Sequence, residues 1–407
     1  MMISPNTLVI LLGTTALGTC CGLVGALMLL RRRALLADAI AHSTLPGICI
    51  AFLIGGSRSL PVLGIGALLS ALLAASLVSW LPRVTRIRKD AATACVLGIM
   101  FGAGIALVGI IQRSGMSGSA AGLDGLLLGR TAGMLRSEAW LFGISAVVMS
   151  LIIVALRKEL LVSCFDPRFG LSSKIPARSI DLLQTSLLAA TIVIALPAVG
   201  VVLTAALVII PAAAARFWTD RFDGLLRTSA LLGAASGIVG TLISSLHTNL
   251  PAGPVIVLSA TTFFVISLLL APGRGWISRF LQKRSRLQNR QLRRFLDGIL
   301  SSELGGSTEV DRQRLLRAST AQNRRVLSNS IRGGWVQADP HRIQLTPVGR
   351  QRAVRARKAL QIWREWLTSE ASIDRDLIDL DEQDIEKILP PDLIETLQKS
   401  IDERGTS

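Results

Sequence analysis

Residues 31–47 read RRRALLADAIAHSTLPG, and they determine how the rest of the chain is interpreted. The stretch follows one long apolar segment and opens another. Asp38 and His42 stand four residues apart, which places both side chains on one face of a helix. Ionisable residues are rare in membrane-spanning helices and usually face a pathway or the bundle interior. Since divalent transition metals accept carboxylate and imidazole ligands, the stretch indicates a membrane protein that handles metal ions.

The composition separates the chain into a membrane part and a soluble part. Half of the 407 residues are hydrophobic, 17% are charged and the mean hydropathy is +0.53, whereas a soluble globular protein carries more charge. Residues 1–272 contain 19 Lys+Arg and 9 Asp+Glu, but residues 273–407 contain 25 and 18 in about half the length. We therefore expect a transmembrane domain over residues 1–272 and a basic, soluble part after it.

Nine apolar segments are long enough to cross a bilayer as helices. They lie near residues 8–30, 34–55, 60–80, 91–111, 138–156, 182–197, 199–215, 228–247 and 254–272. The sixth and seventh run almost together around Pro197, so the count could also be eight or ten. The pattern predicts an all-α polytopic membrane protein of about nine transmembrane helices.

The placement of Lys and Arg predicts the orientation of these helices. With the N-terminus outside, the inner connections contain fifteen Lys and Arg residues and the outer connections contain four. Cytoplasmic loops of membrane proteins carry an excess of such residues. We therefore expect the N-terminus outside and the C-terminal part in the cytoplasm.

Two absences from the sequence limit the chemistry. The five cysteines form no CxxC pair, and four lie in apolar segments, where cysteine behaves as a small hydrophobic residue. The chain contains no GxxxxGK[ST] motif, so it cannot bind nucleotide phosphates through a P-loop. If the chain belongs to an ATP-driven system, the ATPase must be another polypeptide, and this chain is not expected to be an enzyme.

Four stretches of the membrane part, in order, resemble the permease subunits of bacterial ABC importers for zinc, manganese and iron, the ABC-3 family. They are residues 35–48, residues 165–169, residues 198–216 and residues 250–258. The resemblance implies a permease in the bacterial inner membrane that forms the path for a metal ion. It also implies a separate ABC ATPase subunit, a second permease subunit and an extracytoplasmic metal-binding protein. The metal would be the transported substrate, and no cofactor is expected.

The same resemblance suggests roles for individual residues. Asp38 and His42 would lie on the transport pathway and could ligate the metal. The alternative is that Asp38 favours the positive end of its helix dipole and that His42 bonds a neighbouring helix. His247, at the outer end of the eighth segment, could meet incoming metal or could be an ordinary interfacial histidine. In the longest inner loop, Phe165, Asp166 and Pro167 would contact the ATPase; Asp166 before Pro167 also suits a helix N-cap.

The C-terminal part begins with a basic juxtamembrane linker over residues 273–295, which suits contact with anionic lipid headgroups. Residues 335–345 predict a β-hairpin with its turn at Asp339 and Pro340. Residues 331–336, 343–350 and 384–393 resemble the winged-helix regulators of the diphtheria-toxin-repressor class. We therefore expect a cytoplasmic winged-helix-like α+β domain over residues 296–407.

Basic residues around the predicted wing offer possible contacts to DNA phosphates, which position a protein without specifying sequence. The candidates are Arg324, Arg325 and Arg342. A solvated basic face held near an anionic membrane is the simpler explanation.

Taken together, the sequence features predict the permease subunit of an importer for Zn, Mn or Fe. The alternatives are a secondary metal transporter or a membrane-tethered winged-helix transcription regulator.

Overall fold

A computed structural model describes residues 5–55, 59–113, 129, 131–165, 177–246, 250–304, 310–311, 321–339 and 342–369. The chain divides into two compact units, residues 1–278 and residues 279–407. The predicted domain limits at residues 272/273 and 295/296 stay predictions.

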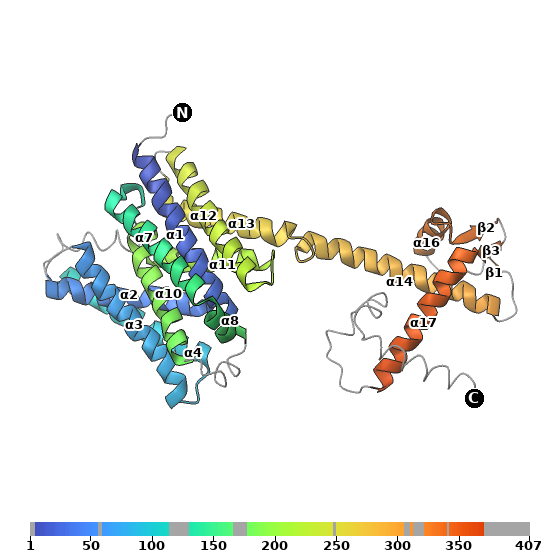
Figure 1. The fold of residues 1–407 in the computed structure, drawn as a ribbon, viewed down its shortest axis with the longest axis horizontal. Coiled ribbons are helices and arrows are strands. Elements are labelled where there is room, and N and C mark those ends of the chain that lie inside the picture. Colours follow the sequence, from blue (N-terminus) through green and yellow to red (C-terminus); the bar gives the residue numbers. More distant parts are fainter. Residues whose placement is uncertain are drawn as a thin grey trace. The chain divides into compact units, whose positions relative to one another are not determined.

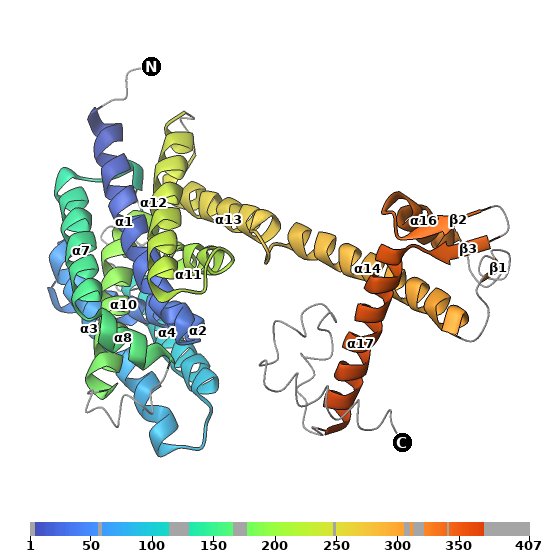
Figure 2. The ribbon, with the colours of Figure 1, turned by 45° about the vertical axis from the view of Figure 1, so that its right-hand side comes forward.

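The described part of the first unit consists of helices (Figures 1 and 2). They are α1 (Pro5–Leu30), α2 (Ala34–Gly55), α3 (Leu60–Val84), α4 (Lys89–Arg113), the short 3-10 helix η1 (Thr131–Gly133), α7 (Arg136–Ala155), α8 (Arg157–Phe165), α10 (Ala177–Val199), α11 (Val201–Arg216), α12 (Phe222–Leu246) and α13 (Ala252–Leu270). Eight of these, α1 to α4, α7, α10, α12 and α13, are long and apolar enough to cross a membrane. The prediction of an all-helical, multi-pass membrane part is confirmed.

The predicted seventh segment is the exception among the nine. It corresponds to α11, which has 16 residues and therefore measures about 24 Å at 1.5 Å per residue, short of the roughly 30 Å hydrocarbon core. Gly200 separates α10 from α11 with a backbone φ of 88°, a conformation that glycine adopts without strain. This single-residue break explains why the two apolar segments almost merge in the sequence.

The two helices that pack most closely are α1 and α12, which lie side by side (Figure 1). A Cβ atom built on Gly18 would lie 2.1 Å from the carbonyl oxygen of Gly233, and the reverse distance is the same. Thr14 and Thr241 share a hydrogen bond of 2.8 Å between their hydroxyls at one end of this contact. Small residues allow this approach, which drives helix association where lipid removes the hydrophobic effect.

The second unit combines helices with a small sheet. Its elements are α14 (Trp276–Leu304), which begins at the end of the first unit, β1 (Val310–Asp311), α16 (Ala321–Arg332), β2 (Val336–Ala338), β3 (Arg342–Leu345) and α17 (Pro347–Ser369). The sheet is antiparallel in the order β1-β3-β2, with Val310 opposite Ile343 and Val336 opposite Leu345. The predicted hairpin is thereby confirmed as β2 and β3. The winged-helix assignment stays a prediction.

One apolar core joins the elements of this unit. Its buried residues are Leu292, Leu296, Ile299, Leu300, Val326, Leu327, Val336, Ile343 and Ala353. Beside the core, Arg357 of α17 forms an ion pair of 2.7 Å with Asp297 of α14 and also donates to the Ser301 hydroxyl. Because Leu292 and Leu296 belong to this core, the second half of α14 is part of a folded unit.

Candidate functional site

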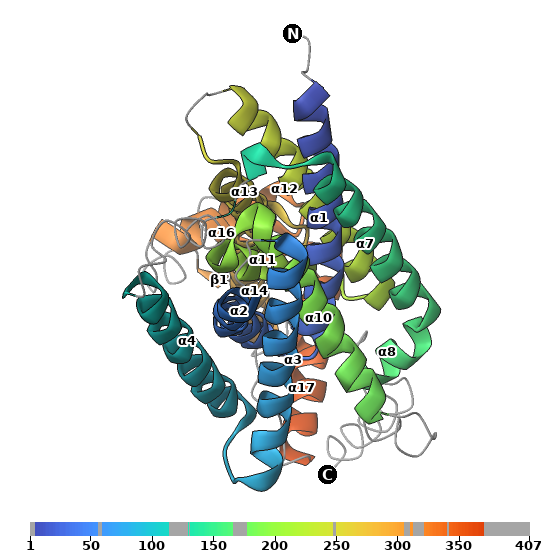
Figure 3. The same ribbon diagram turned by 90° about the vertical axis from the view of Figure 1, so that its left-hand side faces the viewer.

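Helix α2 holds Asp38 and His42, and its surroundings decide how the two side chains are presented. It begins one turn before Asp38, directly after the arginines of the α1–α2 turn. Thirteen of its 22 residues are buried, and Figure 3, which looks nearly along α2, shows it between α3 and α4. A helix so enclosed can leave only a narrow strip of its surface open.

Asp38 and His42 lie on that strip and interact with each other. The distance from His42 Nε2 to Asp38 Oδ1 is 3.4 Å, and the side chains are 22% and 44% exposed respectively. The expectation that they share one helix face is confirmed by this contact. Both groups keep an open side, so an ion or water could reach them.

Phe101 of α4 packs against the imidazole. The two rings are 5.0 Å apart between centroids and meet edge to face at 74°. Edge-to-face contacts between rings are favourable and have a preferred geometry. Phe101 therefore restricts the orientation of His42, a contact that the sequence pattern did not indicate.

The opposite side of α2 is fixed against α3 at backbone level. A Cβ atom on Gly47 would lie 2.1 Å from the carbonyl oxygen of Gly66. Ser70 donates a hydrogen bond of 2.5 Å to the carbonyl oxygen of Ser43, the residue after His42. The helix that holds the Asp38–His42 pair thus has a fixed position relative to α3.

Pro46, inside α2, alters the backbone hydrogen bonding of the helix one turn after His42. A proline has no N–H, so the carbonyl of the residue four positions earlier loses its usual helical donor. That residue is His42. A backbone oxygen and an imidazole of the same residue are therefore both available for polar contacts at this point of the helix.

A second polar group, which the sequence pattern did not predict, lies at the start of α2. Asp181 of α10 accepts hydrogen bonds from both Arg31 and Arg33 on the same oxygen, Oδ1. The arginine run was interpreted only as a sign of membrane orientation. Asp181 stands at the beginning of an apolar segment, and this placement of an acid was the signal that could have revealed a partner for the arginines.

Several predicted site residues lie outside the described residues or only partly within them. His247, Asp166 and Pro167 lie outside. Phe165 is the last residue of α8 and is exposed. Of the predicted DNA contacts, Arg324 and Arg325 fall in α16 and Arg342 begins β3, but their side chains are not described. Their roles stay predictions.

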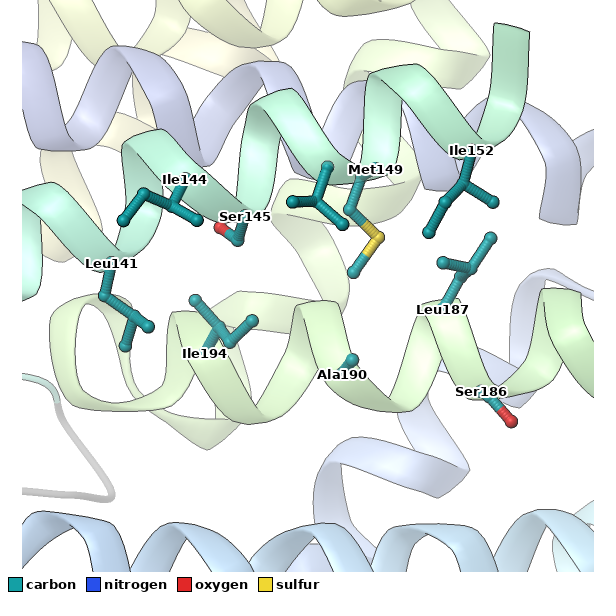
Figure 4. Close-up of a pocket in the computed structure, with 10 residues that line it drawn as sticks. Leu141, Ile144, Ser145, Met149, Ile152, Ser186, Leu187, Ala190 and Ile194 are labelled. Atoms are coloured by element: carbon teal, nitrogen blue, oxygen red, sulfur yellow. The ribbon is translucent and has the colours of Figure 1, made fainter. Parts of the chain in front are cut away.

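A groove between α7 and α10, with a volume of about 370 Å³, is unsuited to metal ions (Figure 4). Its wall is apolar: Met149 of α7 points toward α10 near its centre, and Ile152 faces Leu187 beside it. Among the residues that the structure describes, its only polar lining residues are Ser145 and Ser186. Across the part of the chain that the structure describes, no group of three or more His, Cys, Asp or Glu side chains could hold a metal ion. If the Asp38–His42 pair binds a metal ion, as predicted, it would need further donors from elsewhere.

Comparison with known proteins agrees with this arrangement of helices and site. A model of the ABC 3 transport family matches residues 5–271. The chain belongs to the ABC 3 transport family. The match covers nearly all of the first unit and includes all the membrane-spanning candidates.

The chain is similar to two curated proteins and to one solved structure as follows. The manganese transport system membrane protein MntC of Bacillus subtilis is 41% identical over 292 residues, or 71% of this chain and 67% of the relative. The zinc transport system membrane protein TroC of Treponema pallidum is 38% identical over 275 residues, or 68% and 92%. The structure of PsaBC from Streptococcus pneumoniae in complex with Fab is similar with a TM-score of 0.58 and 28% identity, covering 68% of this chain and 94% of that one.

Proposed function

We propose that this chain is the membrane-spanning permease subunit of an ATP-driven importer of a divalent transition metal ion, Zn, Mn or Fe. Its membership of the ABC 3 transport family and its similarity to membrane proteins of manganese and zinc transport systems support this proposal. The single observation that favours a metal path is the Asp38–His42 pair, partly open within an apolar helix.

The ligand types of the Asp38–His42 pair suit a site that binds a metal ion and releases it again better than a site that stores it. A carboxylate and an imidazole bind divalent transition metals, and a conducting path must bind its ion weakly enough to release it. Two side-chain ligands at 3.4 Å from one another, with water or a second subunit completing the shell, fit this requirement. The metal is the transported substrate here and not a cofactor of the protein.

The proposed assembly needs partners for energy and delivery. The chain has no P-loop, so we propose a separate ABC ATPase subunit, contacted through the loop that contains Phe165, Asp166 and Pro167. A second permease subunit would complete the path, and an extracytoplasmic metal-binding protein would deliver the ion near His247.

The proposed location is the bacterial inner membrane, with the N-terminus outside and the C-terminus in the cytoplasm. The proposed placement of the two termini depends on whether the short helix α11 crosses the membrane. Eight crossings would leave both ends on the same side, whereas a crossing by α11 would place them on opposite sides. The inner excess of Lys and Arg favours nine crossings.

The beginning of α14 suits contact with membrane lipid. Its exposed side chains in the first turns include the apolar Trp276, Ile277, Phe280 and Leu281 and the basic Arg279, Lys283 and Arg284. The four apolar positions share one helix face. A basic amphipathic helix directly after a membrane span is attracted to anionic lipid.

A winged-helix-like domain over residues 296–407 remains the proposal for the second unit. The order of its elements supports it: a helix precedes the β2–β3 hairpin, β1 pairs with β3, and α17 follows. The corresponding second function of the chain is that of a membrane-tethered regulator that binds DNA through Arg324, Arg325 and Arg342. A salt-dependent mobility shift of duplex DNA by the full chain, abolished when the three arginines are replaced by Gln, would be its test.

The main proposal is tested by metal uptake into vesicles that contain this chain and its candidate ATPase, with and without ATP. We expect ATP-dependent uptake of Zn, Mn or Fe, with loss of about tenfold or more on His42→Ala because a ligand type is removed from the path. His341→Ala, which removes a histidine from the second unit, is the matched control and should leave uptake unchanged.

The other outcomes point to the alternatives. Equal uptake without ATP or ATPase would replace the importer by a secondary transporter or channel. An absence of uptake under every condition, combined with DNA binding, would favour the tethered regulator.

A further inference from the structure

The α1–α2 turn is fixed to α8 and α10 by a compact polar group, called here the Arg31–Asp181 cluster. It consists of Arg31, Arg33, Ser163 and Asp181. Arg33 Nη1 lies 2.7 Å from Asp181 Oδ1, and Arg31 reaches the same oxygen with its own Nη1. The second terminal nitrogen of Arg31, Nη2, donates to Ser163 Oγ at 2.5 Å.

The cluster is buried for a group of charged residues at the end of membrane helices. The side chains of Arg31, Arg33 and Asp181 are only 12%, 25% and 18% exposed. Two guanidinium groups share a single carboxylate, so among the residues that the structure describes Asp181 is the acid that pairs with both. Removing one partner from a buried ion pair leaves an uncompensated charge, and here Asp181 is the more critical partner.

The position of the cluster in the chain connects two functional regions. Arg33 is the residue directly before α2, and Asp38 and His42 follow within its first three turns. Ser163 lies two residues before the end of α8, and Asp181 lies in the second turn of α10. The sequence between these helices, residues 166–176, lies outside the described residues; Ser163 and Asp181 lie on the helices that precede and follow it in the chain.

The α1–α2 turn is built to keep this geometry. The N–H of Arg33 donates to the carbonyl of Met28 at 2.9 Å, and the N–H of Arg32 donates to that of Leu29 at 3.0 Å. Arg32 has a φ of 56°, in the left-handed region. This backbone reversal directs the chain from α1 into α2 within three residues, with Arg31 and Arg33 both reaching Asp181.

We propose that the Arg31–Asp181 cluster transmits the movement of the ATPase-contacting loop to α2 and so couples ATP hydrolysis to the opening of the metal path. The inference rests on the proposed importer function. Its residues are positioning residues: they touch neither the metal nor the nucleotide. A displacement of the ends of α8 and α10 is passed to the turn before α2 because Arg31 is bonded to Ser163 of α8 through Nη2 and to Asp181 of α10 through Nη1.

The proposal predicts uncoupling when the cluster is broken. In vesicles that contain the full chain and its ATPase, Asp181→Asn should lower the metal transported per ATP hydrolysed by about fivefold or more, the lower range of typical coupling between sites. Arg33→Gln should have a smaller effect in the same direction, since it leaves a one-to-one pair of Arg31 and Asp181. Asp181→Glu, which keeps the carboxylate, should restore most of the ratio.

Arg32→Gln is the matched control. It removes the same charge from the same turn, but Arg32 is exposed and takes no part in the cluster. Its metal-to-ATP ratio should equal that of the wild type. A loss of the ratio in this variant as well would attribute the effect to surface charge and overturn the proposal.

A purely structural role would give another pattern. Transport and ATP hydrolysis would then fall in parallel with the yield of folded protein, and the ratio would stay constant; this result overturns the proposal. If Asp181→Asn does not fold, Arg33→Gln decides by the same ratio. Failure of the wild type to transport would instead reject the importer function, so the two failures are distinguishable.

Discussion

The Asp38–His42 pair and the two arginines of the Arg31–Asp181 cluster lie within twelve residues of each other, on α2 and the turn before it, yet the two groups are packed in opposite ways. The pair is partly exposed; its two side chains lie 3.4 Å apart, and His42 also packs against Phe101. The cluster is largely buried and has three contacts to one turn. We expect groups that exchange an ion with their surroundings to stay open, whereas the groups that hold these helices together are largely enclosed and bonded to one another.

The largest expected effect comes from moving α2 without changing either group. Gly47→Ala places a methyl group against the backbone of Gly66, so α2 must shift away from α3. Overpacking of this kind costs about 1–3 kcal/mol, and we expect a lower unfolding temperature in detergent by fluorescence. Gly102→Ala on α4 is the control, because a Cβ there meets nothing within 4 Å. Equal destabilisation by both variants would contradict the assignment of a tight α2–α3 contact.

The next effect concerns the open side of α2. Phe101→Leu removes the ring edge that restricts His42, and contacts between rings are worth about 0.5–1.5 kcal/mol. We expect a rise of about 2- to 12-fold in the metal concentration that gives half-maximal uptake, together with a small fall in the unfolding temperature from the lost ring contact. Ile99→Leu, on the same helix and 69% exposed, should change neither quantity. An unchanged uptake curve for Phe101→Leu would mean that the imidazole is oriented by other contacts.

The two groups also differ in how far the sequence predicts them. The Asp38–His42 contact follows from a spacing of four residues within one helix, so periodicity alone is sufficient. The contact from Arg31 to Asp181 spans 150 residues, and no local pattern specifies which helices meet. Phe101 beside His42 is unpredictable for the same reason, since it depends on how α4 packs against α2.

The membrane helices illustrate the same limit. Their number and approximate ends follow from hydropathy, because the bilayer fixes the length of apolar sequence that is needed. The reduced length of α11 depends on the conformation of Gly200, and a glycine in an apolar run gives no sign of whether its φ is positive. Likewise the hairpin of the second unit could be predicted from its turn residues, whereas the pairing of β1 with β3 could not.

A smaller effect tests the turn that separates the two groups. Arg32 has a left-handed backbone conformation, which costs a non-glycine residue roughly 1 kcal/mol. Arg32→Gly should therefore raise the unfolding temperature relative to Arg32→Gln, since both remove the charge and only glycine relieves the strain. A melting comparison in detergent measures the difference. If Arg32→Gln is the more stable of the two, the turn does not adopt this conformation.

The smallest effect uses Cys164, next to Ser163 on α8, as a reporter on the cluster. Burial raises the pKa of the Cys164 thiol above its ordinary value, and the nearby Arg31 charge acts in the opposite direction. Because the thiolate is the reactive form, alkylation at Cys164 should require a higher pH than alkylation of a free cysteine. Arg31→Gln should move that pH still higher, whereas Arg32→Gln should not change it. The measurement is the alkylation rate of Cys164 against pH by peptide mass spectrometry. If Arg31→Gln instead lowers the pH at which Cys164 reacts, the guanidinium acts mainly by keeping the thiol buried and not by stabilising the thiolate.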